Sequence, residues 1–210
     1  MAEMALQMVH MLVADCWAQR YPEYLDSPEF FLGVTGPDAI YIRDGYDKTH
    51  KNEIHLDNWS RLNRQPVIDY WRTWKRPFDV GYGVHVLTDA QWVPRFRERL
   101  PQLILPDGKV NQGIYYNDCF VTDFELLHDI SRLREIMKLL ERAQAPTEHP
   151  LLGFHEFDEY RKHLIRLYAG ECPRHDPVQY VTADYVMEFV NESSALIDEI
   201  FEEAMDRPAL

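Results

Sequence analysis

Two residues that can bind a metal ion lie four positions apart in the stretch GYGVHVLTDAQW. If this stretch is helical, His85 and Asp89 project from the same face and can reach one point. Imidazole nitrogen and carboxylate oxygen both suit Zn²⁺ and similar divalent ions. Gly81 and Gly83 would permit close approach by another part of the backbone. The spacing alone is a weak signal, because a buried, hydrogen-bonded His–Asp pair fits the same pattern.

Three earlier residues are further candidates for the same metal site. His10 lies among apolar residues of the first amphipathic stretch, Asp38 follows Gly-Pro in VTGPDAI, and His55 stands between two apolar residues in NEIHLDNW. Each has an ordinary alternative: a hydrogen-bonded core histidine, an Asx turn and a surface-loop histidine. The neighbouring His50 competes with His55 for the role of ligand.

Later residues offer weaker candidates. Asp118 lies in the aromatic and polar run YYNDCFVTDFELL, where Asp123 could simply cap the following helix. His155 and Glu159 also have helical i, i+4 spacing. Their surroundings, GFHEFDEY, are so acidic that we expect a solvated helix face there instead of a metal site.

Composition limits the class of protein. The chain has 210 residues, of which 46% are hydrophobic and 13% aromatic, so we expect a folded domain. Its three cysteines are far apart and form no CxxC pair, so histidines and carboxylates must hold any metal. The net charge of −13 argues against duplex nucleic acid as a partner but permits a small phosphorylated ligand. The sequence has no apolar run long enough for a transmembrane segment and no signal peptide at its start, so we expect a cytoplasmic location.

The hydrophobic periodicity predicts a single all-α metal-binding domain over residues 1–210, built as a helical bundle. We expect helices at about 5–19, 58–75, 77–90, 122–142, 156–168 and 182–205. Between residues 21 and 58 we expect a long irregular loop, which could contain one short helix opened by Ser27-Pro28. The stretch VQYVT could form a short strand.

Taken in order, the helix with His10, the segment FFLGVTGPDAIYIRDGYDKTHKNEIHL, the stretch GYGVHVLTDAQW and the run IYYNDCFVTDFEL resemble the bacterial zinc-dependent phospholipase C family. The resemblance is to its compact branch without a leader, and it covers roughly residues 1–127. It implies the all-α fold of phospholipases C and single-strand nucleases. By matching motif, Asp38, His55, His85 and Asp89 would hold one Zn²⁺ ion, and His10 with a bridging Asp89 would hold a second.

The chain departs from the family's three-metal pattern. No histidine stands at the expected place after the HxxxD helix. Members with a leader use the amino terminus of the mature chain as a ligand, and we expect that ligand to be absent here. The resemblance therefore implies one or two ions, which could also be another divalent metal.

The implied function is a metal-dependent phosphoester hydrolase that uses a metal-activated water on a small phosphoester or a phospholipid head group. Asp38 would orient that water, Arg43 would bind phosphate as a planar fork, and Asp118 would be an additional ligand or would orient a histidine. Arg43 could equally form a surface ion pair with Asp44 or Asp47. The alternative function is a non-catalytic helical protein whose structural or vestigial metal site binds a phosphorylated ligand or partner. The sequence leaves the oligomeric state open.

Overall fold

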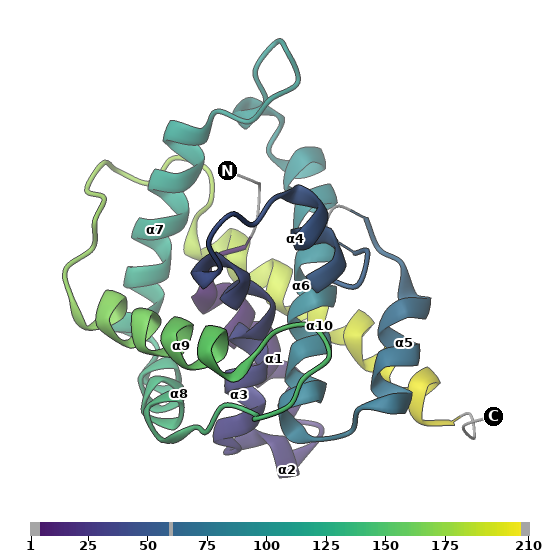
Figure 1. Ribbon diagram of the computed structural model, residues 1–210. Coiled ribbons are helices and arrows are strands. Elements are labelled where there is room, and N and C mark those ends of the chain that lie inside the picture. The colour runs from purple at the N-terminus through teal and green to yellow at the C-terminus, as the bar shows by residue number, and fades with distance from the viewer. Residues whose placement is uncertain (1–4, 59–60, 207–210) are drawn as a thin grey trace.

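The computed structural model describes residues 5–58 and 61–206, and within these ranges the chain is helical without any β-strand. The prediction of an all-α protein is therefore confirmed (Figure 1). No helix in the described part of the chain has the length and apolar character needed to cross a membrane. The helices are α1 (Gln7–Ala18), α2 (Pro22–Leu25), α3 (Pro28–Thr35), the 3₁₀ helix η1 (Gly36–Ile42), α4 (Lys48–Ile54), α5 (Arg64–Thr73), α6 (Pro77–Arg99), the 3₁₀ helix η2 (Pro101–Leu103), α7 (Gln112–Asp129), α8 (Ser131–Arg142), α9 (Phe154–Ala169) and α10 (Ala183–Asp206).

The centre of the fold is the contact between α3 and α6. A methyl group added at Gly33 would lie 1.9 Å from the carbonyl oxygen of Phe78, and one added at Gly81 would lie 2.1 Å from that of Phe30. Only glycine allows the two backbones to come this close. The expectation that Gly81 permits a close backbone approach is confirmed, and this contact fixes α6 relative to the segment that follows α3.

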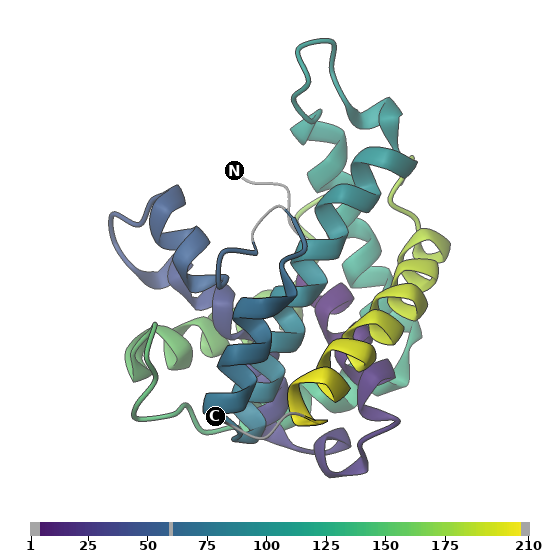
Figure 2. The ribbon, with the colours of Figure 1, turned by 90° about the vertical axis from the view of Figure 1, so that its right-hand side faces the viewer.

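Helix α1 lies inside the bundle, in contact with α3, α6 and α10 (Figures 1 and 2). Most of its residues are buried, so it has no wide polar face. Trp17 near its end packs against Phe30 of α3 and Phe201 of α10. A histidine in the first half of such a helix must also be buried, which is the setting of His10.

The prediction of a long irregular loop between residues 21 and 58 is wrong, because most of this segment is helical in short pieces. Pro22, Pro28 and Pro37 each stand in the first turn of a separate helix, where proline is tolerated. Ser27 caps α3 by accepting a hydrogen bond from Phe30 N. Helices this short carry no sustained period, which explains why the pattern looked irregular. The short helix expected after Ser27-Pro28 is confirmed.

Other boundaries also differ from expectation. Helix α6 continues through Pro94 to Arg99, the single helix expected over 122–142 is divided at Ile130 into α7 and α8, and the helix expected from residue 58 starts at Arg64. Ile130 has extended backbone dihedral angles, which end one helix and precede the next. The stretch VQYVT is not a strand. Its backbone amides bind a side chain of α7, so they are unavailable to a sheet.

Candidate metal centre

Five of the predicted site residues converge in the interior of the bundle. His10 comes from α1, Asp38 from η1, His55 from the end of α4, and His85 and Asp89 from successive turns of α6. All five side chains are fully buried. Two overlapping groups, His10/His85/Asp89 and Asp38/His55/His85, each have ligand atoms within 4.8 Å of one another. The described chain therefore contains buried His/Asp groups that could hold a metal ion.

Backbone carbonyl groups set the orientation of two of the histidine rings. His85 Nδ1 lies 2.7 Å from the carbonyl oxygen of Val34, and His55 Nδ1 lies 2.9 Å from that of Lys51. Because a carbonyl oxygen only accepts hydrogen bonds, each Nδ1 must carry a proton and donate it. Each ring then turns Nε2 toward the carboxylates. This is the second-sphere arrangement common for metal-bound histidines.

The Nε2 atoms of these histidines face carboxylate oxygens at distances that suit an ion between them. Asp89 Oδ2 lies 3.5 Å from His55 Nε2 and 3.6 Å from His85 Nε2, and Asp38 Oδ1 lies 3.9 Å from His55 Nε2. Ligand atoms at about 2.0–2.1 Å from a tetrahedral Zn²⁺ are about 3.3 Å apart. The observed separations are slightly longer, so small side-chain movements would complete the coordination.

Burial determines the protonation state of the His55 and His85 rings. It lowers the pKa of His55 and lowers that of His85 to about 4, so both rings are neutral at neutral pH. A neutral ring that donates from Nδ1 has only a lone pair at Nε2, and this lone pair faces a carboxylate. The alternative, a hydrogen-bonded His–Asp core, would need a buried imidazolium or a protonated carboxyl group at these contacts. A cation between the two acceptors removes the conflict.

Several of these atoms make no hydrogen bond within the described part of the chain: both ring nitrogens of His10, His85 Nε2, Asp38 Oδ1 and Asp89 Oδ2. An unsatisfied buried polar atom costs about 1–3 kcal/mol. A cluster of such atoms is therefore costly unless something binds among them. The residues present fit a divalent cation.

The two oxygens of Asp89 face different histidines. Oδ2 is near His55 and His85, while Oδ1 lies 3.4 Å from His10 Nε2 and accepts a hydrogen bond from Ala5 N at 3.3 Å. The His10 and His85 rings stack with their centroids 3.8 Å apart. Asp89 therefore has one oxygen beside His10 and the other beside His55 and His85.

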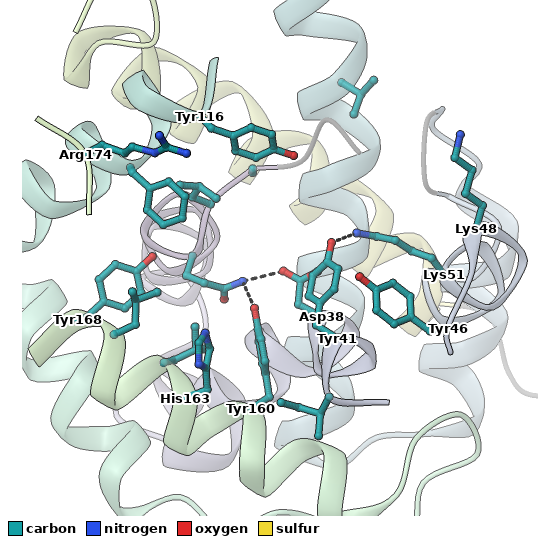
Figure 3. A pocket seen from close by; sticks show the side chains of 18 of the residues that line it. Asp38, Tyr41, Tyr46, Lys48, Lys51, Tyr116, Tyr160, His163, Tyr168 and Arg174 are labelled. Carbon is teal, nitrogen blue, oxygen red and sulfur yellow. Dashed lines mark hydrogen bonds between the residues drawn. The ribbon is translucent and has the colours of Figure 1, made fainter. Parts of the chain in front are cut away.

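Asp38 links the donor cluster to a large cavity. Gln7 Nε2 donates to Asp38 Oδ2 at 2.7 Å and to the Tyr160 hydroxyl at 3.2 Å, which leaves Oδ1 directed toward His55. Burial raises the pKa of the Asp38 carboxyl. Asp38 also lies in the wall of a cavity of about 1510 Å³ (Figure 3). A ligand in this cavity would reach the donor cluster at Asp38.

The cavity wall is mainly apolar and aromatic, with basic side chains on two sides. Figure 3 shows Lys48 and Lys51 on one side and Arg174 on the other. Arg97 is the fourth basic residue of the wall, and the acidic ones are Asp38 and Asp47. Asp47 caps α4 through Thr49 N and His50 N. A chain with a net charge of −13 thus surrounds this cavity with more basic than acidic side chains.

Two predicted site residues lie elsewhere, and these predictions are corrected. The Arg43 guanidinium donates to Glu156 Oε1 at 2.7 and 3.0 Å, and Arg43 is not among the residues of the cavity wall. This pair is neither the phosphate fork nor the Asp44 or Asp47 contact that was expected. Asp118 accepts hydrogen bonds from the backbone amides of residues 179, 180 and 181. Both of its oxygens hold this segment, and Asp118 is in neither of the two His/Asp groups.

The open alternatives among histidines are also settled. His50 is exposed and forms the capping box of α4 with Asp47, so His55 is the residue in the cluster. His155 is exposed and Glu159 pairs with Lys162, which confirms the solvated face expected there.

Sequence reasoning missed Gln7 and Lys51, which adjoin the cluster. Gln7 lies three residues before His10 and Lys51 four residues before His55, so each shares a helix face with a ligand candidate. Polar side chains at these offsets from the histidines were the available signal.

Comparisons with protein-family models, curated proteins and solved structures found no match to this chain.

Proposed function

We propose that this protein is a metal-dependent phosphoester hydrolase, with Zn²⁺ as the metal, of the kind represented by the zinc-dependent phospholipases C. The observation that carries the proposal is the convergence of buried nitrogen and oxygen atoms that face one another as acceptors beside a cavity. The motif resemblance described above supplies the reaction class.

The proposal assigns roles to residues of this chain. His55, His85, Asp38 and Asp89 would hold one ion, and His10 with Asp89 would hold another. When bound, such ions act as Lewis acids on a phosphoryl oxygen and lower the pKa of a water molecule to about 7. Asp38, held by Gln7 at one oxygen and adjoining the cavity, orients the attacking water.

The proposed substrate is a small phosphoester or a phospholipid head group. A wall with aromatic rings and basic side chains accepts an anionic ester attached to an apolar or aromatic group. The cavity volume is above the usual range of about 300–1,000 Å³ for small-molecule sites, so a bulky ester would fit.

Metal analysis and a substrate panel test the proposal. Protein purified without added zinc should contain at least one tightly bound divalent ion by mass spectrometry, and His85→Ala should lose it. A panel of phosphomonoesters and phosphodiesters should include at least one that the protein hydrolyses and that a chelator protects. Full metal retention in His85→Ala would overturn the site, and absence of chelator-sensitive turnover across the panel would overturn catalysis.

The complete burial of the donors favours a second candidate, a structural metal site in a non-catalytic protein. Asp38, His55, His85 and Asp89 would supply the four ligands that close a structural zinc, whereas a catalytic zinc keeps an open position. This candidate predicts that metal removal unfolds the protein and that no phosphoester in the panel is hydrolysed. X-ray absorption at the zinc edge distinguishes the two, because a catalytic site includes a water among its ligands.

A further inference from the structure

Lys51 lies beside the donor cluster, four residues before His55 and in the wall of the cavity. Its side chain is buried, yet it belongs to the cavity wall. Burial lowers the pKa of the Lys51 ammonium group, and the Asp38 and Asp89 carboxylates oppose this shift. In Figure 3 its ammonium group points toward Asp38 and Tyr41.

Tyr41 holds the ammonium group of Lys51 in place. The Lys51 Nζ atom donates a hydrogen bond to the Tyr41 hydroxyl and lies 4.4 Å from the centre of the Tyr41 ring. A cation fixed over an aromatic ring loses little conformational freedom when it binds an anion, because its side chain is already ordered. Lysine otherwise carries a large rotamer entropy.

The backbone and the side chain of Lys51 contribute separately. The carbonyl oxygen accepts the hydrogen bond from His55 Nδ1, so the main chain orients a ligand candidate. The side chain reaches the cavity wall instead. A substitution at Lys51 can therefore remove the ammonium group and leave the carbonyl group that positions His55.

We infer that Lys51 is the residue that binds the phosphoryl group of the ligand, in place of Arg43. Lys51 lies in the wall next to Asp38, whereas Arg43 is bound by Glu156 outside the wall. The other basic residues of the wall, Lys48, Arg97 and Arg174, add to the positive potential that attracts an anion. This inference rests on the proposed function for the identity of the ligand, a phosphate ester with exposed anionic oxygens.

The test is titration of the zinc-loaded protein with inorganic phosphate by isothermal calorimetry. Lys51→Met should weaken phosphate binding about tenfold to a hundredfold, the effect of losing a hydrogen bond to a charged group. Lys51→Arg should retain most of the affinity. Lys138→Met removes the same charge from an exposed position on α8 outside the cavity and should bind phosphate like the wild type. Zinc content is measured in every sample.

Equal phosphate affinity in wild type and Lys51→Met would overturn the inference, as would a wild-type protein that binds no phosphate. If Lys51→Met does not fold, Tyr41→Phe is the second variant. It removes the hydroxyl group that binds Nζ, so it should weaken phosphate binding severalfold, and unchanged affinity would contradict the positioning role. If the wild type bound no zinc, the proposed function would be contradicted. Phosphate titration of metal-free wild type and metal-free Lys51→Met would still test the role of Lys51.

Discussion

Asp89→Asn should stabilise the metal-free protein and abolish its response to zinc. Asp89 Oδ1 accepts the Ala5 amide, and Oδ2 faces His55 Nε2 at 3.5 Å and His85 Nε2 at 3.6 Å. Asparagine can keep its oxygen toward Ala5 N and place its NH₂ group at the Oδ2 position. Two contacts between acceptors then become contacts between a donor and an acceptor. The same change removes one negative charge that an ion needs.

The magnitude follows from these contacts. Once small side-chain movements shorten these contacts of 3.5 and 3.6 Å to hydrogen-bonding distance, each new hydrogen bond contributes about 1 kcal/mol. The metal-free variant then gains about 2 kcal/mol. An unfolding entropy of about 2.1 cal/mol/K per residue over 210 residues converts this gain to a rise in Tm of about 4–5 °C. Zinc at a thousand times its Kd stabilises the wild type by about 4 kcal/mol, or about 9 °C. Asp89→Asn should show no such rise in Tm when zinc is added.

Calorimetric melts with EDTA and with excess zinc measure both effects. Asp123→Asn is the matched control, since Asp123 is equally buried but its Oδ2 accepts hydrogen bonds from Met8 N and the Tyr168 hydroxyl. It should keep the zinc increment. If the cluster were a hydrogen-bonded core of imidazolium and carboxylate, Asp89→Asn would leave buried charges unpaired and cost about 3–5 kcal/mol. A lower Tm in EDTA would therefore refute the metal-site reasoning.

Three further outcomes are expected. Gly81→Ala places a methyl group against the α3 backbone and should lower the free energy of unfolding by about 2–3 kcal/mol in urea titrations. Gly113→Ala, whose added methyl group would make only an ordinary contact of 3.6 Å with Asn111 Oδ1, should raise it slightly. Asp118→Asn should speed hydrogen exchange in the loop whose amides it binds and leave the zinc content unchanged; loss of zinc would restore Asp118 as a ligand. Burial lowers the pKa of His149 to about 4, below its unfolded value of about 6.5, so the unfolded chain binds the extra proton and stability falls as pH drops from 6.5 to 4. The loss of stability is at most about 3 kcal/mol. In EDTA, the Tm of the wild type should fall between pH 6.5 and 4 relative to that of His149→Gln. A constant Tm difference between the two proteins would contradict the lowered pKa of His149.

Local rules predicted only part of the donor cluster, and the grouping of Asp38 and His55 with it came from the motif resemblance. His85 and Asp89 share a helix face by spacing, and the burial of His10 follows from the apolar residues around it. The roles of Arg43 and Asp118 depend on partners far away along the chain: Glu156 is 113 residues from Arg43, and the loop amides are more than 60 residues from Asp118. No local pattern identifies such partners.

The fold was predictable where a helix is long and was missed where proline divides the chain into short helices. The segment from α2 to α4 looked irregular because each helix has too few turns to show a period. Pro94 favoured an early end to α6, yet the helix continues because Val93, Arg95 and Phe96 are buried on both sides of the proline. Tertiary burial outweighed the local cost of proline there.

Helix α4 has an unusual place in this architecture, since its first turn is exposed while His55 at its end reaches the interior. An ion held by His55, Asp38 and His85 would join α4 to η1 and α6. Breaking any one of these segments away would then require release of the ion. We therefore expect amide hydrogen exchange in the three segments to become cooperative when metal is bound, and α4 to open independently when it is removed.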